Sequence, residues 1–100
     1  MNTIEYTQTA IDELDELIQK IYDDKPSVAQ TYFERLEKAI DNLAHSPLMG
    51  VECIKKNIRA NCRILILDNY LVFYSYNLTA NHIKILHIVC GNVHYQRLFD

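Results

Sequence analysis

The sequence lacks the segments and motifs that mark membrane proteins, zinc proteins and nucleotide-binding enzymes. No apolar run approaches the roughly 20 residues of a membrane-spanning helix, and the N-terminal stretch has neither the basic nor the apolar region of a signal peptide. The cysteines form no Cys-x-x-Cys pair, and there is no P-loop, Gly-x-Gly-x-x-Gly or Gly-x-Ser-x-Gly motif. We therefore expect a cytoplasmic protein with no metal, no cofactor and no membrane partner.

Positive charge is also scarce. The chain has 10 lysines and arginines against 13 aspartates and glutamates, which gives a formal net charge of −3. Proteins that grip a nucleic-acid backbone usually carry a basic excess, so any basic surface here must be local. Its candidates are Lys55, Lys56, Arg59 and Arg63. These residues are either a solvated patch or a contact for an acidic target or partner protein.

Cysteine occurs at three widely spaced positions, Cys53, Cys62 and Cys90. Disulfides are rare in reducing compartments, and the sequence shows no secretion signal. We therefore expect reduced thiols that are buried as small apolar side chains.

The second half of the chain contains three runs of branched and aromatic residues, at 64–67, 70–76 and 83–89. Asp68 and Asn69 separate the first two runs, and a polar segment separates the last two. Such runs between turn formers predict an antiparallel three-stranded meander. Residues 51–59 are either a first strand of this sheet or a loop that leads into Arg63.

The first half predicts a short strand and two amphipathic helices. Residues 3–6 favour an edge strand, and Thr7 or Thr9 offers an N-cap for a helix that stops before Pro26. Ser27 and Gln30 have the spacing of a capping box, which predicts that the second helix starts at Ser27. We therefore expect a single α+β domain spanning residues 1–100, with an antiparallel helical hairpin packed on one face of a small antiparallel sheet.

Four local patterns follow one another at spacings that match a known family. They are Leu43-Ala-His-Ser-Pro47-Leu-Met-Gly50, Arg63 followed by Tyr70-Leu-Val-Phe-Tyr74, Ile83-Lys-Ile-Leu-His-Ile88, and Gly91-Asn-Val-His-Tyr95. Together with the order of elements they resemble the RelE/ParE superfamily of toxins from bacterial type II toxin–antitoxin systems. The resemblance covers nearly the whole chain. It implies a growth-arresting protein that a cognate antitoxin neutralises.

One branch of this superfamily cleaves mRNA on the ribosome. That chemistry needs an acid, a base and cations for the charge of the phosphorane. Members often carry an arginine directly after the tyrosine that matches Tyr70, and basic residues after the last strand. Here Leu71 takes the place of that arginine, and residues 89–93 carry no charge. The residues left for a nuclease are His94, Tyr95, Arg63 and His87.

The ParE-like branch is associated instead with poisoning DNA gyrase and is not known to need a catalytic constellation. Its members tend to have a long helical hairpin. The long hairpin expected here, together with Leu71 and the acidic net charge of this chain, favours this branch. The resemblance thus implies a toxin, rather than an enzyme, with DNA gyrase and a cognate antitoxin as partners. Two alternatives stay open: a RelE-like ribosome-dependent mRNA endonuclease acting with the ribosome and mRNA, and a non-toxic binding module that sequesters an antitoxin. We expect the antitoxin to bind the meander edge and part of the helical hairpin.

The candidate residues also have structural interpretations. Tyr70, Tyr74 and Tyr76 suit sheet packing with hydroxyls in water. His87 is expected to share one strand face with Ile83, Ile85 and Val89, as a partly buried, hydrogen-bonded histidine. Arg63 is equally suited to pairing with a carboxylate. His94 and Tyr95 follow a turn and are expected to be accessible.

Overall fold

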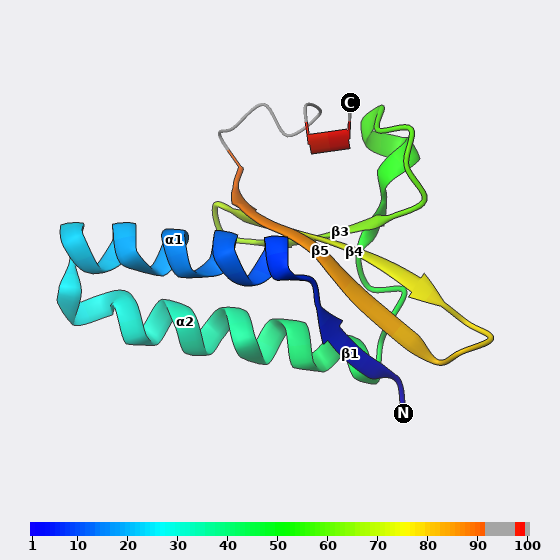
Figure 1. The fold of residues 1–100 in the computed structure, drawn as a ribbon, viewed down its shortest axis with the longest axis horizontal. Helices are drawn as coiled ribbons and strands as arrows, with labels where there is room; N and C mark the ends of the chain where they lie inside the picture. Colours follow the sequence, from blue (N-terminus) through cyan, green and yellow to red (C-terminus); the bar gives the residue numbers. More distant parts are fainter. Residues whose placement is uncertain (92–97, 100) are drawn as a thin grey trace.

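Two helices lie on one face of a five-stranded sheet in the computed structural model, which describes residues 1–91 and 98–99 (Figure 1). Across the sheet the strands are β1 (Thr3–Tyr6), β5 (His82–Cys90), β4 (Tyr70–Asn77), β3 (Arg63–Leu67) and β2 (Val51–Glu52). β1 runs parallel to β5, and the other neighbours are antiparallel. The predicted α+β architecture, the meander and the N-terminal edge strand are confirmed.

The first helix, α1 (Gln8–Asp24), begins where sequence analysis expected it. The Thr7 side chain accepts a hydrogen bond from the Ala10 N–H at 3.1 Å, and its hydroxyl donates to the Ile85 carbonyl at 2.8 Å. The N-cap thus satisfies a helix donor and also ties the start of α1 to β5. The pairing of β1 with β5 ends at Tyr6, and the chain enters α1 directly after it.

The second helix, α2 (Pro26–Asp41), begins at Pro26, so the predicted capping box is wrong. Pro26 lacks an N–H and its φ suits a first helical turn, which lets the helix start before Ser27. Gln30 does not reach back to the helix start; its amide donates to Glu34 Oε1 at 3.1 Å. The short 3₁₀ turn η1 (Asn42–Ala44) continues α2. The turn between the helices makes the antiparallel hairpin seen in Figure 1.

The main core lies between the helices and the sheet. Its buried members are Ala10, Leu36, Ile40, Leu43, Leu65, Val72, Tyr74, Ile83, Ile85 and Ile88. The far half of the hairpin extends past the sheet in Figure 1. The apolar stripe of α1 is therefore only partly buried, and Tyr22 near the far end of the helix is 57% exposed. Closer to the sheet, Leu14 and Leu17 pack against the main core.

A second, smaller core covers the opposite face of the sheet. Its buried members are Cys53, Ile58, Cys62, Ile64 and Phe73. After β2 the chain forms the 3₁₀ turn η2 (Cys53–Lys56) and a loop that returns to β3, so residues 51–59 are both strand and loop. Leu98 and Phe99 pack against this core, with 5.2 Å between the ring centroids of Phe73 and Phe99.

Cys53 and Cys62 form a disulfide, which corrects the expectation of reduced thiols at these two positions. The register of the β2–β3 pair explains it, because Glu52 lies opposite Arg63 and the next opposed pair is Cys53 and Cys62. The Cys53 N–H donates to the Cys62 carbonyl at 2.9 Å, and the Cα atoms are 5.3 Å apart. That separation falls in the range that a disulfide requires. Cys90 is a free thiol.

A bulge in β5 reverses the expected side of His87. Phe73 is opposite His87 and Tyr74 is opposite Ile85, which leaves Leu86 as an extra residue. An inserted residue breaks the two-residue alternation of a strand. Ile83 and Ile85 therefore face the helices, whereas His87 lies against Phe73 on the opposite face. The predicted face shared with Ile83 and Ile85 is wrong for this reason, whereas His87 and Val89 both lie on the side of the second core.

Tyr74 is buried at the centre of β4 and holds the loop after α2. Its hydroxyl accepts the Gly50 N–H at 2.9 Å and donates to the Pro47 carbonyl at 2.7 Å, so the expectation of a hydrated hydroxyl is wrong for this residue. Burial raises the pKa of the phenol. A Cβ at Gly50 would lie 2.7 Å from that hydroxyl and 2.9 Å from the Ile64 carbonyl, so glycine is needed there.

Replacing Tyr74 with phenylalanine tests this loop anchor. Tyr74→Phe keeps the ring but leaves the Gly50 N–H and the Pro47 carbonyl without their partner, so we expect it to lower the free energy of unfolding by about 1–3 kcal/mol. Urea denaturation followed by circular dichroism measures the change. Tyr22→Phe is the matched control, because Tyr22 is 57% exposed. Equal stability of the two variants would contradict the anchor.

Candidate functional site

Arg63, at the start of β3, braces the chain that leads into β2. Its Nη1 donates to the Gly50 carbonyl at 2.7 Å and to the Leu48 carbonyl at 3.3 Å, and its Nη2 lies 3.6 Å from Glu52 Oε1. The Arg63 side chain is partly buried, and these three oxygens engage its guanidinium. Arg63 also lines a pocket of about 370 Å³ with Tyr76, Asn61 and the disulfide.

The other three basic candidates form one exposed surface. Lys55 and Lys56 end η2, and Arg59 follows in the return loop. Asn57 closes the turn between them with a φ of 62°, in the left-handed region that asparagine tolerates. Ile58 points inward to the second core, which leaves the three charged side chains in solvent. We call residues 53–62 the basic loop.

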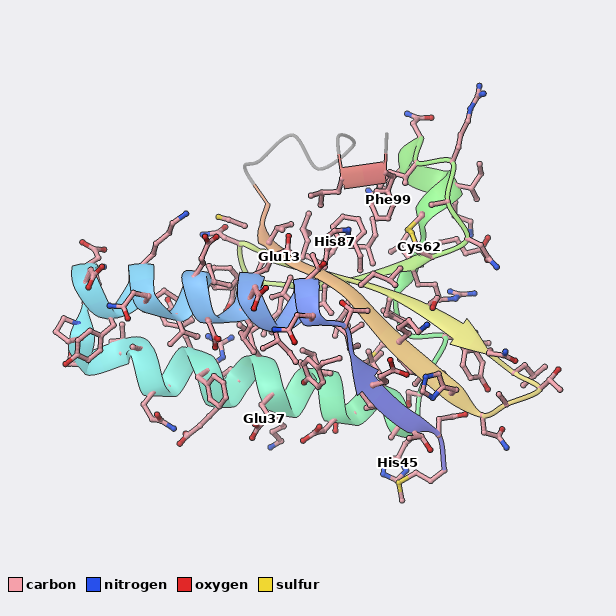
Figure 2. The ribbon with its side chains drawn as sticks, in the orientation of Figure 1. Glu13, Glu37, His45, Cys62, His87 and Phe99 are labelled. Carbon is pink, nitrogen blue, oxygen red and sulfur yellow. A yellow bond between two sulfur atoms is a disulfide. The ribbon has the colours of Figure 1, made fainter. Side chains whose placement is uncertain are left out.

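His87 is held by Glu13 from α1. Its Nδ1 lies 3.1 Å from Glu13 Oε1, and the same oxygen accepts the Ile88 N–H at 3.2 Å. Figure 2 shows Glu13 reaching from the helix toward His87, with Phe99 nearby. The imidazole packs edge-on against the rings of Phe73 and Phe99, at centroid distances of 6.3 and 5.4 Å. A carboxylate that holds Nδ1 orients a histidine, and here it also joins α1 to β5 beyond the end of β1.

The structure describes only two of the four residues expected for a nuclease. Arg63 and His87 have structural partners, while His94 and Tyr95 lie outside the described residues. Leu71 packs against the second core, in the position where nuclease relatives often carry an arginine. Within residues 1–91 and 98–99, no three His, Cys, Asp or Glu side chains are arranged to hold a metal ion. No helix in this part of the chain is long and apolar enough to cross a membrane.

A groove of about 570 Å³ lies between the helical hairpin and the sheet. Leu17, Ile21 and Val28 supply its apolar lining, and the rings of Tyr32 and Tyr70 meet edge to face at 5.8 Å. Charged residues surround the apolar lining: Glu13, Glu16, Lys20, Asp24 and Lys25. The sequence signal for it was present in the apolar stripe of α1, which is longer than the sheet can cover.

This arrangement of helices and strands is that of a known toxin fold. The crystal structure of the toxin–antitoxin complex RelBE2 from Mycobacterium tuberculosis superposes with a TM-score of 0.62 at 20% sequence identity, covering 89% of this chain and 96% of that chain. At this identity the likeness establishes the fold. No curated protein matches the sequence.

The sequence itself identifies the family. The family described as the ParE toxin of the type II toxin–antitoxin system parDE matches residues 4–95. The chain therefore belongs to the ParE toxin family. It is the toxin of a type II toxin–antitoxin system, and its partner is a cognate antitoxin.

Removing Glu13 tests whether it joins α1 to the sheet. Glu13→Ala leaves the Ile88 N–H and His87 without their acceptor, so we expect a loss of about 1 kcal/mol in the free energy of unfolding. Glu16→Ala, one turn further along the same helix, is the matched control and should change stability little. Urea denaturation measures both variants. An unchanged stability of Glu13→Ala would show that the contact contributes nothing.

Proposed function

We propose that this toxin arrests growth by acting on DNA gyrase in the cytoplasm. The observation that carries the proposal is the state of Arg63. Its guanidinium is engaged by two backbone carbonyls and by Glu52, so its charge is not free to stabilise a phosphorane. A ribonuclease needs such a cation close to an acid and a base.

Two further residues support the same proposal. Leu71 places an apolar side chain in the second core where nuclease relatives often carry a cation. His87 has its Nδ1 against Glu13 and its ring edge-on to Phe73 and Phe99, so it has a structural role that explains its presence without catalysis. A toxin that acts by binding its target does not require these groups.

The basic loop is the surface that we assign to target contact. Lys55, Lys56 and Arg59 are exposed together on a protein with a net charge of −3. A local basic patch on an acidic protein favours approach to an acidic surface in one orientation. The loop lies across the sheet from the helices, so a target bound there leaves the groove free for the antitoxin (Figure 1).

Expression of the chain alone in a bacterium separates the possible targets. We expect early DNA-damage signalling while incorporation of labelled amino acids is still intact. Early collapse of protein synthesis with a silent damage reporter would indicate the ribosome-dependent mRNA endonuclease. Continued division without either signal would indicate a non-toxic module that sequesters an antitoxin.

Charge reversal in the basic loop tests the contact surface in the same assay. We expect the combined change Lys55→Glu, Lys56→Glu and Arg59→Glu to raise the inducer concentration that is needed to stop growth by about tenfold or more. The reason is that like charges replace a complementary contact. The matched control reverses Lys20, Lys38 and Lys84, which lie on the helices and β5. Equal loss in both variants would show an effect of net charge alone. Unfolding curves verify that both variants fold.

We further propose that the antitoxin lays an amphipathic segment into the groove and along the free edge of β3. The groove offers apolar side chains bordered by charges of both signs, which suits an amphipathic helix. β2 pairs only with Arg63 and Ile64 of β3, so the edge at residues 65–67 is available for an added strand. Ile66 is exposed beside that edge.

Binding measurements with the antitoxin test this site. Ile21→Glu puts a charge into the apolar lining, and we expect it to weaken binding by about tenfold or more. Ile11→Glu is the matched control on the same helix, outside the groove. Hydrogen exchange should show protection in the groove and at residues 65–67 when the antitoxin binds. Protection confined to residues 91–100 would place the site elsewhere.

A further inference from the structure

The disulfide sits at the base of the basic loop, beside a pocket that reaches it from solvent. Cys53 is fully buried and Cys62 is 7% exposed, and both line the pocket of about 370 Å³ with Asn61, Arg63 and Tyr76. Figure 2 shows the sulfur–sulfur bond next to the label of Cys62, between the loop and the sheet. Both cysteines belong to the second core, but only Cys62 keeps some exposed surface, so a small thiol or disulfide can approach Cys62 through the pocket more readily than Cys53.

We propose that Cys53 and Cys62 form a reversible thiol–disulfide site, whose oxidised form holds the basic loop in its folded shape. The bond closes a ring that contains all three exposed cations of the loop, Lys55, Lys56 and Arg59. That ring determines where these charges lie on the surface.

Apart from the disulfide, the backbone hydrogen bonds that hold this loop are local. The Cys53 N–H donates to the Cys62 carbonyl and the Ile58 N–H to the Cys53 carbonyl at 3.1 Å, while the Asn57 N–H donates to the Ile54 carbonyl and the Cys62 N–H to the Ala60 carbonyl. Among the residues between the two cysteines, Ile58 is the most deeply buried, and it packs in the same core as Cys53 and Cys62. Two of the three buried residues of the loop are the cysteines themselves, so opening the covalent link weakens much of what orders the exposed residues between them.

The redox step is a thiol–disulfide exchange with a low-molecular-weight disulfide such as glutathione disulfide. The Cys62 thiolate attacks one sulfur of glutathione disulfide and releases one glutathione thiolate. The Cys53 thiolate then attacks the Cys62 sulfur of the mixed disulfide and releases the second. Two cysteine thiols and one glutathione disulfide thus give the protein disulfide and two molecules of glutathione, which receive the two protons. Excess glutathione drives the reverse reaction.

Equilibration in glutathione buffers tests reversibility on the unmodified protein. We expect the fraction of the disulfide, trapped by alkylation and read by mass spectrometry, to change from mostly reduced to mostly oxidised across the series. A pair that stays oxidised in excess glutathione is a permanent structural link, and one that never oxidises is not a disulfide site. Either result overturns the proposal.

The rate of trypsin cleavage measures how ordered the loop is, because the cleavage sites at Lys55, Lys56 and Arg59 lie inside the ring. We expect cleavage there to be at least tenfold faster in the reduced protein, with cleavage after Lys38 in α2 unchanged. The double variant Cys53→Ser, Cys62→Ser should be cleaved at the reduced rate in every buffer. Cys90→Ser should behave as the original protein. Equal cleavage of the loop in both redox states, or a response that follows Cys90, overturns the proposal.

Single variants test the order of attack. Cys53→Ser leaves Cys62 at the pocket and should take up one glutathione, whereas Cys62→Ser leaves the buried Cys53 and should take up little. Equal uptake would contradict the assigned order and with it the route through the pocket. The link between loop order and target contact rests on the function proposed above. The exchange and proteolysis measurements do not involve toxicity, so failure of the gyrase proposal would leave their outcome unchanged.

Discussion

The hydroxyl of Tyr74 is the contact on which the functional side of the molecule depends. It holds the Pro47 carbonyl and the Gly50 N–H, and so sets the path of the chain from the second helix into β2. Arg63 completes the same connection from the neighbouring strand. Because β2 is only two residues long, its register depends on this anchored entry. The register then brings Cys53 opposite Cys62 and positions the basic loop.

The sheet separates two surfaces that we assign to different partners. The helices cover one face, and the overhang of their hairpin leaves an apolar groove bordered by charges. The basic loop, together with Leu98 and Phe99, covers the other face with a smaller core. Such a division allows a target and an antitoxin to bind a small toxin by different contacts. The strands β3, β4 and β5 contribute side chains to both cores, so any coupling between the two surfaces would pass through them.

The bulge at Leu86 shows how one inserted residue changes the interpretation of a candidate. Without it, His87 would face the helices beside Ile83 and Ile85. With it, His87 joins Phe73 and Phe99 and takes Glu13 as its partner. Glu13 had no signal in the sequence beyond its place on a polar helix face. Its role follows from where β1 ends. Beyond Ile85 the edge of β5 has no strand partner, and Glu13 accepts the hydrogen bond of the Ile88 N–H there.

The sequence by itself determined the local elements and the family. Alternating and helical periodicities, the turn residues and the Thr7 cap are set by neighbours in the chain, so strands, helices and their order were predictable from them. The tertiary structure decided the disulfide, the side of His87, the partners of Arg63 and Tyr74, and the groove. Each of these depends on register between distant segments or on how far a helix extends past a sheet. Sequence spacing carries no record of such contacts, because they arise when separate elements pack together.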